Sequence, residues 1–299
     1  MKAASPRVTR RQVLLSGGAL LLGALAPVAH AKAVRRVIVV GGALAEVVYA
    51  LDAQDGARNA LVATDTTCTY PEAARRLPKV GYQRALSAEG LLSLHPDLIL
   101  ASAEAGPPGV LAQVKQAGVE VLSFAEHHDA ATVREKITGI AGTLDVAARG
   151  AALLARFDDE WQRAQTAVDA SGLARRPQPP RVLFVLNHAG NQALVAGQKT
   201  AADAMLGYAG VRNAMQGFDG YRPLSAEALV AVAPDIVLTT DEGLAAVGGA
   251  NALLATPGFA ATPAGKSQRL VSMDALFMLG FGPRLPRAVT TLNQRLATA

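Results

Sequence analysis

A tyrosine on a polar loop is the residue of this chain best suited to bind a metal. Tyr70 lies in the segment Thr64–Val80, which is rich in turn-forming and hydroxyl residues, and Pro71 follows it directly. Proline disfavours a helical backbone at the residue before it, so we expect an extended Tyr70 whose ring points outward. A phenolate is a hard oxygen ligand that suits ferric iron, including the iron of a haem. A tyrosine that only lies on a loop surface is the alternative.

A histidine in the second half of the chain is a candidate for a second ligand. His188 closely follows the apolar run Val182–Leu186 and stands in the polar sequence Asn187–Asn191, so we expect it in a loop at the end of a buried strand. It would be a second iron ligand or, alternatively, a loop histidine bonded to the backbone. His127 and His128 are adjacent and diverge to opposite sides, which makes them a poor chelating pair.

Four further residues are candidates to contact an anionic or aromatic ligand. Guanidinium groups are the usual partners of carboxylates such as the propionates of a porphyrin, although most arginines are solvated surface charges. Tyr221 and Arg222 share the loop Phe218–Pro223. In an internal repeat of the chain they correspond to Tyr82 and Arg84. The predicted contacts are Arg75, Arg84, Tyr221 and Arg222.

That repeat indicates that the chain consists of two related halves. The segment Leu86–Leu100 (LSAEGLLSLHPDLIL) recurs as Leu224–Leu238 (LSAEALVAVAPDIVL), and Gly-Tyr precedes both copies. In each copy a serine is suited to cap a short helix, a glutamate stands in its first turn, and Pro-Asp ends it before an apolar strand. Because the period is so long, we expect two α/β domains in tandem rather than a solenoid or a propeller.

The duplicated glutamates Glu89 and Glu227 have two interpretations. A carboxylate in the first turn of a helix stabilises the helix dipole, and that role alone would explain both residues. Two equivalent carboxylates, one in each half, would also suit docking on basic residues of a partner with two-fold symmetry.

The elements expected around these residues form two Rossmann-like lobes with central, mostly parallel sheets. The β-branched runs Val37–Val40 and Val182–Leu186 are typical of buried parallel strands and would open the two lobes. Apolar residues at helical spacing predict one helix over Val146–Ser171, roughly 40 Å long, that joins the lobes. The predicted domains are residues 32–145, an interlobe helix at 146–173, and residues 174–299.

Residues 1–31 have the features of an export signal. A basic start precedes an apolar stretch too short to span a bilayer, and Ala29–Ala31 is a small-x-small cleavage site. The pair Arg10-Arg11 leaves a twin-arginine and a general secretory route open. These residues hold four positive charges and no negative ones, so the net charge of +5 falls to +1 without them. The remainder has no basic stripe for a nucleic acid and no segment that would insert in a membrane.

Sequence signatures of enzymes are missing. The chain has no G-x-S-x-G, H-E-x-x-H, Walker loop or G-x-G-x-x-G motif after a strand, although a secreted α/β enzyme remains an alternative. Cys68 is the only cysteine, so an intramolecular disulfide is impossible, and we expect this thiol to be a half-buried filler.

Several motifs together resemble the periplasmic haem-binding proteins of bacterial ABC haem importers, which belong to the long-helix class (class III) of periplasmic binding proteins. The resemblance covers nearly all of the chain after residue 31. It is carried by the following segments: Asp65–Pro71, Leu77–Tyr82, Leu86–Gly90, Glu104–Pro108, Ala196–Asp203, Gly217–Tyr221 and Gly280–Arg284.

The resemblance implies a soluble periplasmic carrier in which the Tyr70 phenolate binds the iron of ferric haem between the lobes. It also implies that Glu89 and Glu227 seat on arginines of a dimeric ABC permease with its ATPase subunits, downstream of an outer-membrane haem receptor. Some relatives hold two haems, and His188 matches the second ligand. One departure is that Pro71-Glu72, and no basic residue, directly follow the tyrosine.

The alternatives within the same architecture are carriers of a ferric siderophore or of cobalamin. A zinc or manganese carrier is less favoured, because such sites need three or four clustered histidine and carboxylate ligands.

Overall fold

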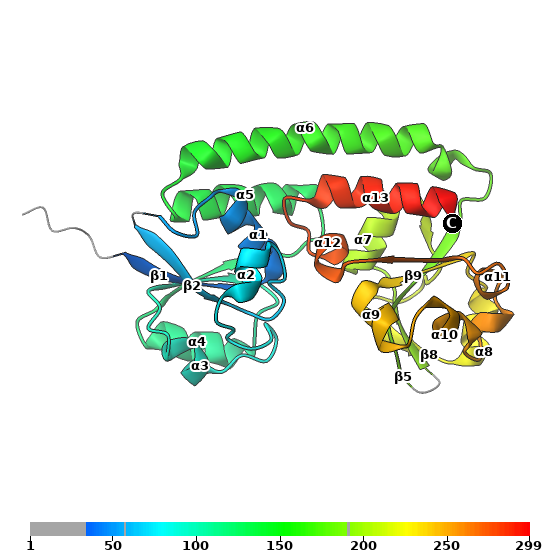
Figure 1. Ribbon diagram of the computed structural model, residues 1–299, viewed down its shortest axis with the longest axis horizontal. Helices are drawn as coiled ribbons and strands as arrows, with labels where there is room; N and C mark the ends of the chain where they lie inside the picture. The colour runs from blue at the N-terminus through cyan, green and yellow to red at the C-terminus, as the bar shows by residue number, and fades with distance from the viewer. Residues whose placement is uncertain (1–33, 57, 190–191) are drawn as a thin grey trace, which may run out of the picture. The chain divides into compact units, whose positions relative to one another are not determined.

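The first half of the chain forms a four-stranded sheet in which every pair of neighbours is parallel. The strand order is β2-β1-β3-β4, shown in the computed structural model of Figure 1, which describes residues 34–56, 58–189 and 192–299. The strands are β1 (Arg35–Val40), β2 (Asn59–Thr64), β3 (Leu98–Ser102) and β4 (Glu120–Phe124). Every residue of β3 is buried, as expected for a strand covered on both faces.

Helices cover both faces of this first sheet. Alternate residues of β1 explain the layering, because Val37 and Val39 pack in one core cluster with α1 and α5, whereas Ile38 and Val40 pack in another with α3 and α4. The helices are α1 (Gly42–Ala50), α2 (Glu72–Arg76), α3 (Ala88–Leu92), α4 (Pro108–Gln116) and α5 (Ala130–Thr143).

The second half contains a mixed sheet. Its main path is β10-β9-β5-β6-β8, and β7 pairs with β5 off that path. The pairs β10–β9, β9–β5 and β5–β7 are parallel, but β6 runs antiparallel to both β5 and β8. The expectation of mostly parallel sheets therefore holds fully for the first half and only partly for the second. The strands are β5 (Arg181–Ala189), β6 (Gln192–Ala196), β7 (Arg212–Asn213), β8 (Tyr221–Leu224), β9 (Ile236–Thr240) and β10 (Leu270–Met273).

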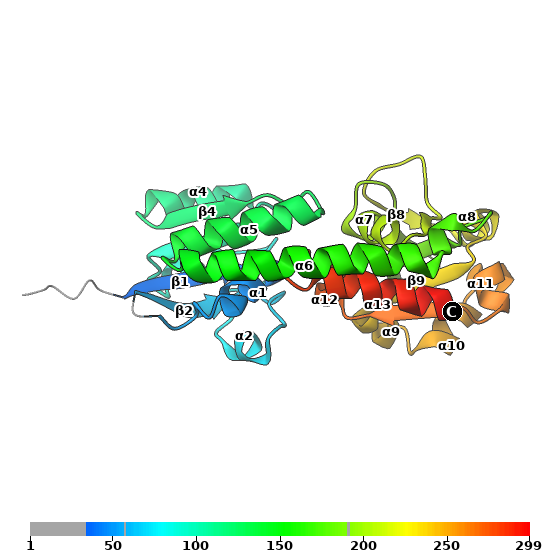
Figure 2. The same cartoon turned by 90° about the horizontal axis from the view of Figure 1, so that it is seen from above.

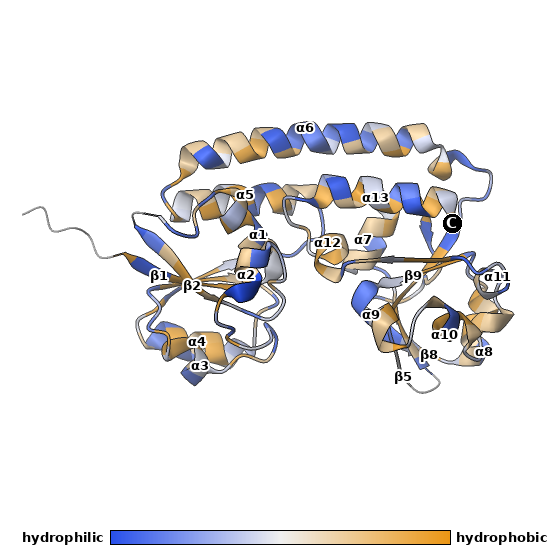
Figure 3. Cartoon of the chain, in the orientation of Figure 1, coloured by the Kyte–Doolittle hydropathy of each residue, from blue (hydrophilic) through white to orange (hydrophobic). Residues whose placement is uncertain are grey.

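Helices of the second half again lie on both faces of its sheet. Val182 and Phe184 of β5 join one core cluster with α7, and Leu183 and Val185 join another with α8 and α10. Figure 3 shows the matching hydrophobic colour along the central strands. The helices are α7 (Ala201–Tyr208), α8 (Ala226–Val232), α9 (Asp241–Ala246), α10 (Ala250–Ala255), α11 (Pro263–Lys266) and α12 (Ala275–Leu279), with short 3-10 turns at Leu173–Arg175 and Phe259–Ala261.

The predicted long helix is present as α6 (Ala147–Ser171) and joins the two halves. The last helix, α13 (Leu285–Thr298), runs alongside it in both Figure 1 and Figure 2. Trp161 of α6 is buried, stacks on Phe157 at 6.4 Å between ring centroids, and contacts Tyr208 of α7 edge-on at 5.0 Å. This contact fixes the long helix to the second half.

The two copies of the repeat form equivalent structures. Ser87 Oγ accepts a hydrogen bond from the Gly90 N–H at 3.0 Å, and Ser225 Oγ accepts one from Ala228 at 3.3 Å, so both serines cap their helices as predicted. Asp97 Oδ2 accepts from the Arg36 N–H at 2.7 Å. The second copy repeats that bond, from the Arg181 N–H to Asp235 Oδ2 at 2.8 Å. Each aspartate therefore anchors its strand to the neighbouring parallel strand.

Residues Val34–Ala299 pack as one compact unit. The predicted export signal at residues 1–31 lies outside the described residues, and the domain boundaries predicted after residues 145 and 173 stay predictions. In the described part of the chain, no helix combines the length and the apolar character needed to cross a bilayer.

Candidate functional site

A cavity of about 790 Å³ lies between the two halves, where strand ends from both sheets meet. This volume is in the usual range for small-molecule sites, and the carboxyl ends of strands are where open α/β sheets bind ligands. The first half contributes Gly41, Gly42, Ala43, Thr67, Thr69, Tyr82, Gln83, Arg84, Ser102, Glu104, Glu126 and His128. The second half contributes Leu186, Leu194, Lys199, Thr200, Ala201, Gly220, Tyr221, Glu242, Ala275, Leu276, Leu279 and Gly280.

The loop that carries Tyr70 is held in place by two buried or partly buried charged groups. Asp65 is fully buried, and its carboxylate accepts hydrogen bonds from the backbone N–H groups of Gly41 (2.8 Å) and Thr67 (2.9 Å). Lys79 Nζ donates to Thr64 Oγ1 at 2.7 Å and to a backbone carbonyl of α2 at 2.9 Å. The loop is thus fixed at both ends by contacts that sequence reasoning did not identify.

Cys68 is buried beneath this loop rather than half-buried as expected. Its solvent-exposed fraction is 0%, and its Sγ lies 3.0 Å from Asp65 Oδ1. Burial, together with the neighbouring Asp65 carboxylate, raises the pKa of the thiol well above its ordinary value. The thiol is therefore protonated and part of the loop's packing.

Tyr70 itself is not among the residues that line the cavity, but its neighbour Thr69 is. The Tyr70 side chain is exposed, as predicted, with 45% of the residue accessible. The Arg284 guanidinium carbon lies 3.7 Å from the centroid of the Tyr70 ring, a cation–π contact. A basic group therefore does lie beside the tyrosine, but it comes from the start of α13 and not from the residues after Pro71.

Arg284 is held by a buried carboxylate on α1. Its Nε donates to Glu46 Oε2 at 2.8 Å, its Nη2 donates to Oε1, and the Glu46 side chain is only 4% exposed. Burial raises the pKa of Glu46, and the hydrogen bond and charge of Arg284 counteract that rise. For Arg284, burial lowers the pKa, but the hydrogen bond and charge of Glu46, together with Tyr70 and Asp274, outweigh it, so the pKa lies above its ordinary value.

The cavity wall contains two cationic side chains, each with a carboxylate partner. Arg84, a predicted ligand contact, donates from Nη2 to Glu104. Lys199, which sequence reasoning did not single out, lies 2.7 Å from Asp219 Oδ2. An anionic ligand in the cavity would therefore compete with Glu104 for Arg84 and with Asp219 for Lys199.

The two equivalent Gly-Tyr pairs of the repeat contribute one ring each to the cavity. Tyr82 comes from the first half and is 46% exposed, and Tyr221 comes from the second and is 38% exposed. Burial raises the pKa of Tyr221, as does nearby Glu104, whereas Arg84 and a hydrogen bond with Thr200 lower it. The net rise keeps Tyr221 a neutral phenol, which suits stacking or hydrogen bonding better than binding iron.

The other predicted arginines lie outside the lining of this cavity. Arg75 is exposed on α2 and pairs with Glu72 at 3.8 Å. Arg222 lies on β8 with its guanidinium 4.7 Å from the centroid of the Phe218 ring. The structure places Tyr221 and Arg84 among the lining residues of the cavity, whereas Arg75 and Arg222 are not among them.

His128, which the sequence argument set aside, lines the cavity. Its ring centroid lies 5.3 Å from that of Phe281, and among the described residues its buried Nδ1 has no hydrogen-bond partner. Burial lowers the pKa of His128, so the imidazole is neutral near pH 7. Glu126, two residues before His128, also lines the cavity and accepts a hydrogen bond from fully buried Lys136 at 2.6 Å.

His188 lies in β5 instead of in a loop after it. The strand continues to Ala189 and forms an antiparallel pair with β6, in which His188 is opposite Ala193. The direction of the His188 side chain is outside the described part of the structure, so its role as a second ligand stays a prediction.

Glu89 and Glu227 are exposed in the first turns of α3 and α8, one in each half. Hydrogen bonds from its own backbone N–H and from Ser225 lower the pKa of Glu227, which is the behaviour of a carboxylate at a helix start. Docking on a partner stays a prediction for both residues.

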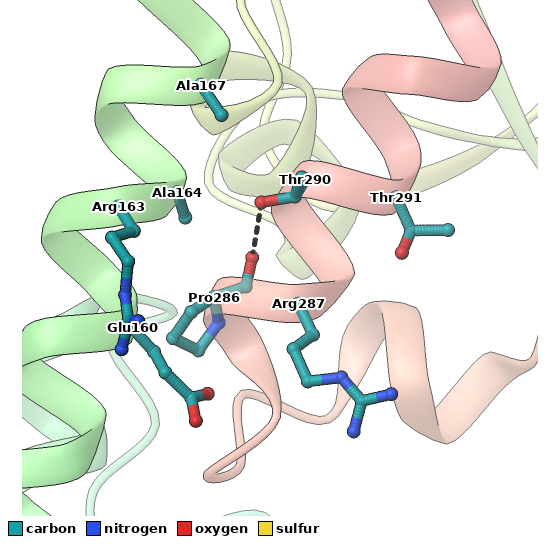
Figure 4. A pocket seen from close by; sticks show the side chains of 8 residues that line it. All are labelled: Glu160, Arg163, Ala164, Ala167, Pro286, Arg287, Thr290 and Thr291. Carbon is teal, nitrogen blue, oxygen red and sulfur yellow. Dashed lines mark hydrogen bonds between the residues drawn. The ribbon is translucent and has the colours of Figure 1, made fainter.

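A smaller hollow of about 400 Å³ lies between α6 and α13 (Figure 4). It is open, and neither sheet contributes to it. Its lining residues are Glu160, Arg163, Ala164, Ala167, Pro286, Arg287, Thr290 and Thr291. With no aromatic side chain and no strand end, it is a poorer candidate than the interlobe cavity.

Two α/β lobes joined by one long helix, with a cavity at the strand ends between them, define a class III periplasmic binding protein. The chain belongs to the periplasmic binding protein family, whose pattern it matches over residues 37–276.

Solved structures with the same fold are similar over most of the chain. The periplasmic heme-binding protein BhuT, solved in complex with two hemes, is 69% identical with a TM-score of 0.86, covering 89% of this chain and 99% of that one. The periplasmic heme-binding protein RhuT from Roseiflexus sp. RS-1, in apo form, is 38% identical with a TM-score of 0.81 and coverages of 89% and 99%. A periplasmic heme-binding protein from Pseudomonas aeruginosa is 36% identical with a TM-score of 0.78 and coverages of 89% and 93%.

Similarity to other binding proteins is weaker or shorter. The uncharacterized ABC transporter substrate-binding lipoprotein YvrC of Bacillus subtilis is 25% identical over 84% of this chain and 76% of its own length. The vitamin B12-binding protein of Vibrio vulnificus is 33% identical over only 92 residues, 31% of this chain and 32% of that protein.

Proposed function

We propose that this protein is a periplasmic haem-binding protein that captures ferric haem in the interlobe cavity and delivers it to an inner-membrane ABC importer. The observation that carries the proposal is Tyr70, an exposed phenol on a loop that Asp65 fixes and that contributes Thr67 and Thr69 to the lining of the interlobe cavity. The 69% identity, over 89% of this chain, to a protein solved with two hemes supports the same ligand.

The chemistry of the cavity suits a flat, mostly apolar dianion. Tyr82 and Tyr221 provide rings on opposite lobes, and leucines of β5, β6 and α12 provide apolar walls. Arg84 and Lys199, one from each lobe, would bind the propionates. Arg75 and Arg222 lie outside the lining and stay further candidates. His188 would serve as the ligand of a second haem.

Tyr70 would bind the ferric iron as a phenolate. Ferric iron prefers hard anionic oxygen ligands, and a tyrosinate ligand disfavours reduction, so the haem would be carried in its oxidised form. The protein's part is to bind and release this cargo, with no reaction catalysed.

Delivery would use the exposed faces that carry Glu89 and Glu227. One carboxylate on each lobe suits docking on arginines of a dimeric permease, which works with its ATPase subunits. An outer-membrane haem receptor would supply the cargo upstream.

Titration of the purified protein with hemin, followed by absorption, tests the proposal. We expect the wild type to give the spectrum of a five-coordinate ferric haem with a tyrosinate ligand, and Tyr70→Phe to lose it. Tyr208→Phe is the matched control, because Tyr208 packs on Trp161 away from the cavity and should leave the spectrum unchanged. A Tyr70→Phe protein with the wild-type spectrum would remove Tyr70 from the site.

Cobalamin is the alternative for which a specific observation exists, the short similarity to vitamin B12-binding proteins. Parallel titrations with cobalamin and a ferric siderophore distinguish the cargoes, and we expect tight binding of hemin alone. The secreted-enzyme alternative predicts turnover, for which the cavity offers no activated nucleophile among the described residues.

A further inference from the structure

We propose that Arg284 is a positioning residue for Tyr70, holding its ring in place and stabilising the phenolate when it binds ferric haem. This inference rests on the proposed function, and it assigns a role to a residue 214 positions further along the chain. Its basis is one contact, in which the guanidinium carbon lies 3.7 Å from the centroid of the Tyr70 ring.

The geometry of Arg284 is fixed from several sides. Two nitrogens of its guanidinium bond to the two oxygens of Glu46, and the Phe277 ring centroid lies 4.9 Å from its carbon. The chain just before it is held by Lys136 Nζ, which donates to the Phe281 carbonyl at 3.4 Å. The paired and stacked guanidinium therefore has little freedom to leave the tyrosine ring.

Packing at Gly282 adds to this restraint. A Cβ atom built on Gly282 would lie 3.2 Å from Glu46 Oε2, so the backbone passes directly against the carboxylate that holds Arg284. A residue with a side chain at this position would push Glu46 and with it the guanidinium.

The arginines nearest to Tyr70 in sequence do not take this position. Arg75 and Arg76 both pair with Glu72, at 3.8 and 3.5 Å. Both are mostly exposed, so water screens their charges more than that of Arg284, whose side chain is 20% exposed.

A cation over the ring has a definite electronic consequence for a phenolate. It lowers the energy of the electrons on the ring and its oxygen, so they are donated less strongly to iron. Loss of the cation should therefore shift the phenolate-to-iron charge-transfer band to longer wavelength. It should also lower the reduction potential of the haem, because stronger donation and the loss of a positive charge both favour the ferric state.

Three variants separate this role from a structural one. Arg284→Gln removes the charge but leaves Glu46 buried without its cation, which would destabilise the fold. The double variant Glu46→Gln with Arg284→Gln removes both charges and should recover much of the lost thermal stability. Arg284→Lys keeps a positive charge without the planar stacking surface.

For the haem-loaded proteins we expect the following results. Arg284→Gln and the double variant should both show the longer-wavelength band and the lower potential, with ferric haem affinity reduced about tenfold. Arg284→Lys should return the band part of the way to its wild-type position. The matched control is Arg134→Gln, because Arg134 also lies over a ring (Phe157, 5.4 Å) and pairs with a carboxylate (Asp158, 2.6 Å), but on α5 away from the cavity.

Two results would overturn the proposal. A double variant with the wild-type band and potential would reduce Arg284 to a structural ion pair, and a lysine variant identical to the glutamine variant would exclude an effect of charge. Failure of the proposed function looks different, because the wild type itself would then give no tyrosinate–haem spectrum.

Discussion

The cations of the cavity wall are not free in the absence of a ligand. Arg84 bonds to Glu104 and Lys199 to Asp219, and both pairs are substantially exposed. Exposed ion pairs of this kind contribute little to stability, so a carboxylate ligand would displace them at small cost. These acidic partners would therefore adjust the affinity for an anionic ligand without preventing binding.

Glu104→Gln should raise the affinity for ferric haem. The substitution leaves Arg84 without a competing carboxylate, and an exposed pair worth about 0.5–1 kcal/mol corresponds to about a two- to fivefold gain. Glu242→Gln is the control, because Glu242 also lines the cavity but forms no ion pair with Arg84 or Lys199. Equal gains in both variants, or a loss of affinity in Glu104→Gln, would contradict this role of Glu104.

His128 should make the unloaded protein less stable in mild acid. Its pKa is lowered below 6.5 in the folded state, chiefly by burial, although Glu104 and Glu126 raise it and Lys136 and His127 lower it. Below pH 6.5 the unfolded chain therefore binds a proton that the folded chain does not. The free energy of unfolding should fall as the pH decreases from about 6.5 towards the folded pKa, and this contribution is absent at higher pH.

Denaturant unfolding at pH 7.5 and 5.5 measures this effect. His128→Gln should lose less stability between the two pH values than the wild type, whatever the substitution costs at both. An equal pH dependence in the two proteins would show that His128 does not carry it.

For single residues, the local sequence predicted exposure to solvent but not contacts with distant parts of the chain. Pro71 and the polar loop were enough to predict an exposed Tyr70, and 45% exposure confirms it. The cation beside it could not be predicted, because Arg284 reaches the ring only where the segment before α13 packs against Glu46 of α1. His128 was missed because the sequence does not reveal which of the two neighbouring histidine rings the fold directs into the cavity.

Among the helices and strands, the repeat predicted both helix-and-strand units. The serine that caps each helix and the Pro-Asp pair that ends it are signals in the local sequence. The antiparallel strand β6 was not predicted, and β5 runs past the expected end at Leu186. The polar residues after Leu186 have the composition of a loop, and only pairing with β6 keeps them extended. Strand ends fixed by a distant partner are therefore beyond local pattern reasoning.

Gly150 of α6 packs closely against α5. A Cβ atom on Gly150 would lie 2.4 Å from the Ala141 Cβ, whereas one on Gly142 of α5 would meet nothing within 4 Å. Gly150→Ala should destabilise the protein by about 1–3 kcal/mol through overpacking. Gly142→Ala should stabilise it by about 0.4–1 kcal/mol, because alanine restricts the unfolded chain. Denaturant melts measure both, and a neutral Gly150→Ala would mean that the helices separate easily.

At the scale of the whole molecule, one core cluster continues through both lobes. It includes Val39 and Leu100 of the first sheet, Phe184 and Leu238 of the second, and Trp161 of α6 between them. A continuous core means that neither lobe can lose its packing without exposing apolar surface of the other. The long helix is thus part of both cores, not merely a tether.

The described unit should consequently unfold in a single transition. Trp161 is the only tryptophan, so its emission reports the packing of α6, while far-ultraviolet circular dichroism reports all helices and strands. The two signals should give the same denaturation midpoint. Midpoints that differ, or a biphasic dichroism curve, would indicate lobes that unfold separately.

A crystal structure of the protein with ferric haem would show whether Tyr70 binds the iron. We predict a haem in the interlobe cavity with its iron within bonding distance of Tyr70 Oη. A haem whose iron lies beyond the reach of that oxygen, or one bound outside the cavity, would contradict it.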